Sequence, residues 1–371
     1  MTMEGKDSIR ANKGEWSELY VLFKLLGEGK VYAGDSDLKR LDAYYPILRI
    51  LRDELEHHME YEYATEDKNI IVVTENGEKA ARISVKDFLD NSRTLFKKIK
   101  EGSSGKGSFD IPSLNDFLGK IHCKKIKAKS SDKADIHIVI HDYHTGMNSN
   151  LGFSIKSDVG SAPTLLNASK ATLFTYEVAG DGMNDETMNM VNSISGKRKI
   201  QDRVNAIHKN GFSLVFKSTS DIFYNNLFMI DCSLPKIVAW MMADCYLHRN
   251  MDIWEATERI KEANPMSFDL SFGHDHYGYK LKSMMIAIAL GMLPGTKWSG
   301  KYEATGGYLV VKEDGEVLCF HIYDRNMLED YLFKNTKFET PTSDRYEHMG
   351  KMYKEDDGKY YFNLVLQIRF K

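Results

Sequence analysis

The stretch DIHIVIHDYHTGMNSNLGFSIKS, residues 135–157, holds two segments in which apolar and polar residues alternate. The three isoleucines of DIHIVIH share one face of an extended chain, and Phe153 and Ile155 share one face of the second segment. A turn-rich connection separates the two segments. The stretch therefore predicts two consecutive strands of a meander within one sheet.

The polar faces of these two expected strands carry an acid and a base. If both apolar faces pack on the core, Asp135 and Lys156 point into a common cleft. An Asp on one strand of a hairpin and a Lys on its partner form the physical core of the PD-(D/E)xK nucleases. There the Asp binds a divalent metal that polarises the phosphate, and the Lys orients the attacking water or helps to deprotonate it. A surface hairpin with a solvated Asp and Lys fits the pattern alone equally well.

The second acid of the PD-(D/E)xK pattern, two residues before the lysine, is replaced here by Ser154. A hydroxyl is a poor replacement for a carboxylate on Mg²⁺, so another residue is expected to supply the charge. The segment GEWSEL, residues 14–19, begins an apolar-periodic helix and offers Glu15 and Glu18 one turn apart. We favour Glu15, with Glu18 second and Glu177 as a further alternative.

The rest of the chain predicts an α/β protein with a mixed central sheet and an αβββαβ core. We expect residues 1–29 to form the N-terminal glutamate helix of the core, 30–118 a helix and hairpin insertion, 119–180 the catalytic sheet and 181–371 an α+β extension that recognises DNA. The expected elements are a helix over Gly14–Leu26, a helical stretch over Ser36–Glu60 kinked at Pro46, a hairpin turning at Asn76-Gly77, a helix from Ser84 to about Lys100, strands over Ile121–Ala128 and Ala171–Val178, helices over Leu234–His248 and Ile253–Ala263, a hairpin turning at Asp314-Gly315, and a last strand YYFNLVLQIRFK.

Composition narrows the class of protein. The chain has 371 residues, 42% of them hydrophobic and 28% charged, with a formal net charge of -3. No apolar run is long enough to span a bilayer and the N-terminus is polar, so we expect a cytoplasmic protein. The four cysteines are far apart, which argues against a disulfide scaffold or a zinc site. One local patch, residues 97–129, has nine lysines against three acids and is a candidate phosphate-facing surface, or simply a solvated one.

Several long segments resemble the HpaII-type restriction endonuclease family. They include GEWSELYVLFKLL, DIHIVIHDYHTGMNSNLGFSIKS, PTLLNASKATLFTYEV, GGYLVVKEDGEVLCFHIYDRN, YLFKNTKFETPTSDRYEHMGKMY and NLVLQIRF, which together cover nearly the whole chain. The resemblance implies a type II restriction endonuclease that cuts double-stranded DNA at CCGG after the first cytosine. It also implies dependence on Mg²⁺, a cognate DNA methyltransferase as functional partner, and a native SxK variant of the catalytic motif.

Base reading needs donors and acceptors that reach into a groove of the DNA. The segment NTKFETPTSDRY, residues 335–346, offers Ser343 and Arg345, and Arg345 suits a bidentate contact with guanine. Asn167 and Thr172 are further candidates for DNA contact, although turn capping would explain them equally well. A palindromic site favours a homodimer on DNA or sequential nicking by a monomer. A repair or junction nuclease, and a non-catalytic DNA-binding protein with a decayed site, remain as alternatives.

Overall fold

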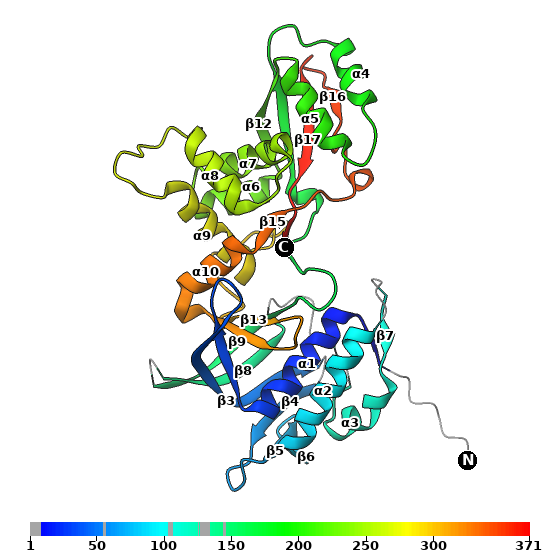
Figure 1. Ribbon diagram of the computed structural model, residues 1–371, viewed down its shortest axis with the longest axis vertical. Coiled ribbons are helices and arrows are strands. Elements are labelled where there is room, and N and C mark those ends of the chain that lie inside the picture. The colour runs from blue at the N-terminus through cyan, green and yellow to red at the C-terminus, as the bar shows by residue number, and fades with distance from the viewer. Residues whose placement is uncertain (1–8, 55–56, 103–106, 125, 127–133, 144–145) are drawn as a thin grey trace, which may run out of the picture. The chain divides into compact units, whose positions relative to one another are not determined.

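The computed structural model describes residues 9–54, 57–102, 107–124, 126, 134–143 and 146–371. Over these residues the protein is a mixed α/β structure with ten α-helices and four β-sheets (Figure 1). Contacts divide the chain into two compact units, each made of two segments. The first unit comprises Met1–Pro163 and Tyr302–Tyr331, and the second comprises Thr164–Lys301 and Leu332–Lys371. The expected α/β class is confirmed, but the chain divides differently from the four consecutive segments expected.

The first unit is built on a nine-stranded mixed sheet. Its strand order is β2-β14-β13-β9-β8-β3-β4-β5-β6, and β2 also pairs with β3, so six strands form a closed ring of pairings. The pair β8–β9 is antiparallel, as the alternating stretch predicts, and β13 pairs in parallel with the other edge of β9. The strands are β2 (Lys30–Gly34), β3 (Arg40–Glu54), β4 (His57–Tyr63), β5 (Ile70–Glu75), β6 (Glu78–Ser84), β8 (Ile136–Asp142), β9 (Met147–Ser157), β13 (Gly307–Val311) and β14 (Val317–His321).

Helices α1 (Lys13–Glu28) and α2 (Val85–Glu101) lie side by side in this unit (Figure 1). Both begin at side-chain caps, because Asn12 accepts a hydrogen bond from the Glu15 amide and Ser84 accepts one from the Asp87 amide. Their apolar faces bury Trp16, among others, in a core shared with β8 and β9. The remaining elements are β1 (Arg10–Ala11), β7 (Phe109–Asp110), α3 (Asn115–Lys120) and α10 (Arg325–Lys334), the last of which continues into the second unit.

The second unit combines two small sheets with a group of helices. One sheet has the order β12-β11-β17-β16 and the other β10-β18-β15. The strands are β10 (Thr164–Leu166), β11 (Leu173–Ala179), β12 (Ser213–Thr219), β15 (Thr336–Phe338), β16 (Met352–Lys354), β17 (Tyr360–Val365) and β18 (Ile368–Phe370), and the helices are α4 (Asp185–Ser193), α5 (Lys199–Lys209), α6 (Asp221–Ile230), α7 (Leu234–His248), α8 (Ile253–Ala263) and α9 (His276–Leu290). The bounds of α7 and α8 are those that the sequence predicts. No described helix is long and apolar enough to cross a membrane.

The expected helix over residues 36–60 is wrong, because this segment forms β3 and the start of β4. A β-bulge between Ile47 and Arg49 shifts the register of β3 against β8. Buried positions therefore fall at residues 45, 47, 50, 51 and 52 rather than in strict alternation, so the segment lacks the period of two that predicts a strand. Residues 30–84 accordingly contribute strands to the central sheet and are not a helical insertion.

Two expected hairpins of the first unit are confirmed, and one expected strand is not. The hairpin at Asn76-Gly77 and the hairpin at Asp314-Gly315 are confirmed as β5–β6 and β13–β14. The expected strand over Ile121–Ala128 is wrong where it is described, since residues 121–124 form a turn and an irregular segment. Its residues 125, 127 and 128 lie outside the described residues, as do residues 103–106 of the lysine-rich patch.

Candidate active site

The first element of the site is the carboxylate of Asp135, which directly precedes β8. Its Oδ2 atom accepts hydrogen bonds from the Ile155 amide at 2.6 Å and from the Ser154 hydroxyl at 3.1 Å. The Asp135 amide in turn donates to the Phe153 carbonyl at 2.8 Å. Strand β9 thus holds the carboxylate through two hydrogen bonds and the backbone of Asp135 through a third. Ser154, at the position of the second acid, is 3% exposed and orients Asp135 through its hydroxyl.

The second element is Lys156, two residues further along β9. Alternation along the strand puts its side chain on the same face as that of Ser154, which is bonded to Asp135. Burial lowers the pKa of Lys156, and the negative charges of Asp135 and Glu18 partly oppose this decrease. The structure therefore brings the expected acid and base together on one face of two adjacent strands. The lysine is partly desolvated there, which favours its neutral form more than water would.

The third element is the side chain of Glu18 on α1. Burial, followed by the neighbouring charge of Asp135, raises the pKa of its carboxyl to about 8. Arg52, Glu15 and Lys156 also act on this pKa, the two cations lowering it and the glutamate raising it. Burial and a second carboxylate both disfavour the charged form of Glu18. A cation beside the two carboxylates would favour that charged form.

Glu15, the favoured glutamate of the sequence, has a structural partner instead. Its Oε2 atom accepts a hydrogen bond from the Asn12 amide at 2.8 Å, which together with the reciprocal bond to Asn12 forms the capping box of α1. Glu177, the further alternative, lies on β11 in the second unit and pairs with Lys359 at 2.9 Å. The geometry therefore favours Glu18 over both as the carboxylate that accompanies Asp135.

Two residues near this site are not predicted by any pattern in the sequence. Arg52 on β3 is 7% exposed, and its guanidinium donates hydrogen bonds to Cys123 Sγ at 3.3 Å and to the Ile126 carbonyl. Tyr308 on β13 is 2% exposed, and the Lys156 ammonium lies 5.3 Å from the centre of its ring. Arg52 was hidden because its segment resembles a helix, and Tyr308 because it is far from the catalytic stretch in sequence.

Two carboxylates and a lysine set limits on the metal that this site fits. No group of three or more His, Cys, Asp or Glu side chains arranged to hold a metal ion occurs among the described residues. Oxygen ligands from one or two carboxylates, with water completing the shell, are the usual protein contribution to a Mg²⁺ site. The mutual repulsion of Asp135 and Glu18, visible in the raised pKa of Glu18, is what a divalent cation between them would relieve. The donor set therefore fits a hard divalent cation.

The candidate DNA contacts all belong to the second unit. Asn167 and Arg345 are exposed, and Ser343 and Arg345 form a single 3₁₀ turn. Thr172 is 0% exposed, and its hydroxyl accepts from the Ser169 amide at 3.0 Å and donates to the Ser169 carbonyl at 3.1 Å. Thr172 thus caps a turn, as the alternative reading of the sequence has it, and does not present its side chain to a ligand.

The lysine-rich patch of the first unit is largely paired where it is described. Lys98 lies 2.8 Å from Glu101, and Lys97 lies 3.9 Å from the same carboxylate. Lys124 lies 2.7 Å from Glu75, whose pKa is held at about 2 mainly by its hydrogen bonds with Lys124 and His122. These pairs leave the patch with less free positive charge than its composition indicates.

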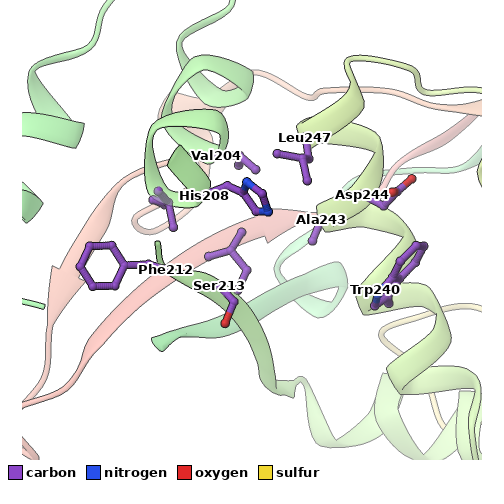
Figure 2. Close-up of a pocket in the computed structure, with 10 residues that line it drawn as sticks. Val204, His208, Phe212, Ser213, Trp240, Ala243, Asp244 and Leu247 are labelled. Atoms are coloured by element: carbon purple, nitrogen blue, oxygen red, sulfur yellow. The ribbon is translucent and has the colours of Figure 1, made fainter. Parts of the chain in front are cut away.

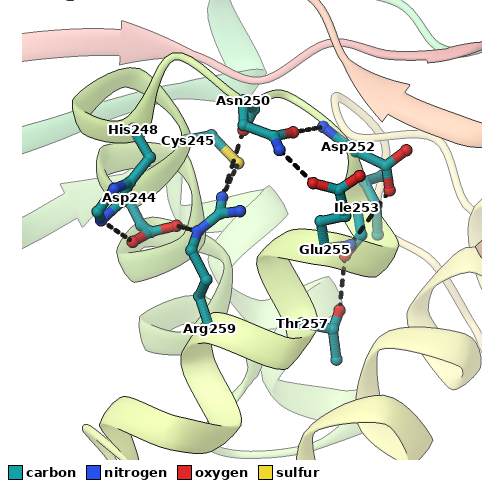
Figure 3. Close-up of polar contacts among 9 residues, drawn as sticks. All are labelled: Asp244, Cys245, His248, Asn250, Asp252, Ile253, Glu255, Thr257 and Arg259. Atoms are coloured by element: carbon teal, nitrogen blue, oxygen red, sulfur yellow. Dashed lines mark hydrogen bonds and ion pairs between the residues drawn. The ribbon is translucent and has the colours of Figure 1, made fainter.

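The second unit contains a hollow of about 190 Å³ bounded by α5, α7 and the start of β12 (Figure 2). Most of its lining is apolar, including Val204, Phe212 and Trp240. Its one buried charged residue, Asp244, is already neutralised. The Asp244 carboxylate accepts from Arg259 Nε at 2.6 Å and lies 3.2 Å from His248 Nε2, which ties α7 to α8 (Figure 3). None of the candidate catalytic residues lines this hollow.

Comparison with known proteins identifies the kind of enzyme. Residues 12–370 match the model of the HpaII restriction endonuclease family. The chain is 46% identical over 360 residues to the type II restriction enzyme HpaII of Haemophilus parainfluenzae, and the match covers 97% of this chain and 98% of that enzyme. No solved structure matches the chain significantly. The protein is therefore a type II restriction endonuclease, an enzyme that cuts DNA at specific sites. The chain belongs to the HpaII restriction endonuclease family.

Proposed function

We propose that the first unit carries a PD-(D/E)xK nuclease core that hydrolyses one phosphodiester bond in each strand of the sequence CCGG, after the first cytosine. The observation that carries the catalytic part is the cluster of Asp135, Glu18 and Lys156, in which the charge of one acid raises the pKa of the other. The cutting site and position rest on the family resemblance. The reaction needs a divalent metal, for which we propose Mg²⁺.

Each residue of the cluster has a separate task in this proposal. Asp135 and Glu18 would hold the cation, and Ser154 fixes the Asp135 carboxylate through its hydrogen bond. The metal, when bound, would supply Lewis-acid polarisation of the phosphate and a more acidic water. Lys156 binds the attacking water, and the lowered pKa of its amine enlarges the neutral fraction that is able to accept the water proton.

The bond changes balance without a further reactant. The water oxygen forms a bond to phosphorus, and the bond between phosphorus and the 3′ oxygen breaks. Lys156 takes up the proton from the water. The departing 3′ oxygen acquires a proton from solvent, which leaves a 5′ phosphate and a 3′ hydroxyl.

We assign DNA recognition to the second unit, with Asn167, Ser343 and Arg345 as contact residues. The exposure of Asn167 and Arg345 and the residue types of all three support this assignment, whereas Thr172 is buried and caps a turn. A symmetric site is best served by a homodimer on DNA, or by two successive nicks. A DNA methyltransferase that modifies the same site is the expected functional partner, because the enzyme would otherwise cut the same sequence in the DNA of its host.

The decisive experiment is digestion of a sequenced plasmid in the presence of Mg²⁺. We expect fragments whose ends all map to CCGG with a 5′ overhang, and no cutting by Asp135→Asn. DNA binding without cutting in either Mg²⁺ or Mn²⁺ would instead indicate a binding protein with a decayed site. Preference for branched over linear DNA would indicate a repair or junction nuclease.

A further inference from the structure

The strand β13 contributes a tyrosine ring to the face of the sheet that carries the candidate catalytic residues. Parallel pairing sets Tyr308 opposite Ser154 and Val310 opposite Lys156. Directly paired residues of neighbouring strands point to the same side of a sheet, so Tyr308, Ser154 and Lys156 share one face. The Lys156 Nζ atom lies 5.3 Å from the centre of the Tyr308 ring, within the range of a cation–π contact.

We propose that Tyr308 is a positioning residue whose ring holds the end of Lys156 in reach of the attacking water and stabilises the ammonium that forms when Lys156 takes up the water proton. The inference rests on the proposed role of Lys156 and adds a part to it. A lysine stem has four rotatable bonds and a compact charge, so its end is poorly fixed unless a partner restricts it. Ser154 and the Ile155 amide restrict the side chain of Asp135 in this way, and the Tyr308 ring restricts the side chain of Lys156.

Burial of the ring makes this contact stronger than a surface one. Tyr308 is 2% exposed, and a cation–π contact gains strength when water is excluded from it. Burial, followed by the charge of Asp135, also raises the pKa of Tyr308 well above its ordinary value. The side chain therefore stays neutral, and it acts on Lys156 through the π face of the ring rather than as a phenolate.

A pair of substitutions separates the ring from the hydroxyl. Tyr308→Phe keeps the ring, so its single-turnover cleavage rate should stay within about twofold of the unaltered enzyme. Tyr308→Leu removes the ring, and the rate should fall on the order of tenfold or more, with the affinity for DNA in the absence of metal unchanged. A fall as large in Tyr308→Phe as in Tyr308→Leu would overturn the inference, because the hydroxyl would then be the functional group.

Loss of packing is controlled in two ways. Tyr61→Leu removes another fully buried tyrosine of the first unit and should lower the melting temperature without lowering the rate of the folded enzyme. Tyr308→pentafluorophenylalanine keeps the shape of the ring but reverses the polarity of its face. Its cleavage rate should follow that of Tyr308→Leu, although its melting temperature stays close to that of the Phe variant. A rate equal to that of the Phe variant would show that shape alone matters and would reject the cation–π role.

A double-mutant cycle distinguishes failure of this inference from failure of the proposed function. Lys156→Met should abolish most cleavage, and adding Tyr308→Leu should then cost little more, because the ring acts through the lysine. If Lys156→Met cleaves normally, the proposed catalytic role itself is wrong. If Lys156→Met is inactive and Tyr308→Leu lowers its residual rate by the same factor as in the unaltered enzyme, only the positioning role is wrong.

Discussion

At the scale of single residues, the active site depends on what each polar group is bonded to rather than on which residue types are present. Glu15 and Glu18 are one turn apart on α1, and the sequence favours Glu15 with Glu18 second. The structure separates them, because the Glu15 carboxylate closes the capping box with Asn12 whereas the Glu18 carboxyl is desolvated near Asp135. Capping patterns are readable in advance, since N-x-x-E at a helix start predicts this use of the glutamate. The burial of Glu18 depends on the packing of strands that are distant in sequence, so the local sequence does not predict it.

Replacing each of these glutamates by glutamine should have different consequences for the cleavage rate. Glu18→Gln removes a charge that the metal needs, so we expect cleavage to fall by more than about 100-fold, since even indirect partners of a metal are worth ~10–100-fold. Glu15→Gln retains an oxygen able to accept from the Asn12 amide, so its rate and melting temperature should stay near those of the unaltered enzyme. Rates under single-turnover conditions at saturating Mg²⁺ measure both. The reverse order of effects would restore Glu15 as the metal ligand.

The raised pKa of Glu18 also predicts how metal binding depends on pH. Between its unfolded value near 4.5 and about 8, the folded, metal-free protein holds a proton on Glu18 that the unfolded chain has lost. Stability without metal therefore falls as the pH rises through this window, and metal binding must displace the proton. We expect the affinity for Mn²⁺ to rise by up to about tenfold per pH unit until about pH 8 and to level off above it. Calorimetric titration in buffers of different ionisation enthalpy should record one proton released. A pH-independent affinity would contradict this assignment.

At the scale of secondary-structure elements, success or failure of the sequence prediction follows local regularity. Helices α7 and α8 have the bounds predicted from apolar spacing, and β8 and β9 have the alternation predicted for strands with one buried face. Strand β3 was missed because its bulge breaks the period of two. The parallel pairing of β13 with β9 joins segments far apart in the sequence, such as Gly307 and Phe153, and no local pattern encodes such a pairing.

The end of β14 has a buried histidine that predicts acid sensitivity. His321 is 2% exposed, its Nδ1 accepts from the Tyr323 amide at 3.1 Å, and its Nε2 has no hydrogen-bond partner among the described residues. Burial lowers the pKa of this imidazole from 6.5 to about 4. The unfolded chain then binds a proton that the folded chain does not, so stability falls as the pH drops from 6.5 towards 4, by at most about 3 kcal/mol.

Replacing His321 tests this account directly. His321→Phe keeps an aromatic ring against Tyr45 and removes the titrating group, so the melting temperature should change less between about pH 6.5 and about pH 4.5. The matched control is His137→Phe, which removes an exposed histidine of β8 in the same sheet and should leave the acid slope unchanged. An unaltered slope in His321→Phe would assign the acid sensitivity to other groups.

At the scale of the whole molecule, the candidate catalytic residues belong to one compact unit and the candidate DNA contacts to the other. Such a division predicts that changes in the second unit alter the choice of sequence with little effect on the chemistry. Sequence reasoning assigned recognition to the C-terminal half, but it did not show that Tyr302–Tyr331 returns to the first unit. That return depends on strand pairing with β9 and β2, which only the folded chain displays.

Arg345 provides the test at this scale. Its guanidinium is exposed on a 3₁₀ turn and forms no ion pair with any described residue. Arg345→Ala should cost ~1–3 kcal/mol at one base position and relax selectivity there, since a bidentate contact with guanine has that value. Binding measured in Ca²⁺ against each single-base variant of CCGG reports the loss. Equal weakening on every sequence, with a smaller salt dependence, would make Arg345 a phosphate contact.

The order in which the two units occur along the chain has a consequence for biosynthesis. Glu18, Asp135 and Lys156 all leave the ribosome early, whereas β13, the strand that pairs with β9 and supplies Tyr308, follows only after Thr164–Lys301 of the second unit. Until then one edge of β9 is unpaired, and Lys156 lacks the Tyr308 ring beside it. A nascent or truncated chain ending before Gly307 therefore contains the candidate catalytic side chains without strand β13. The proposed catalytic site is thus complete only after most of the chain has been made.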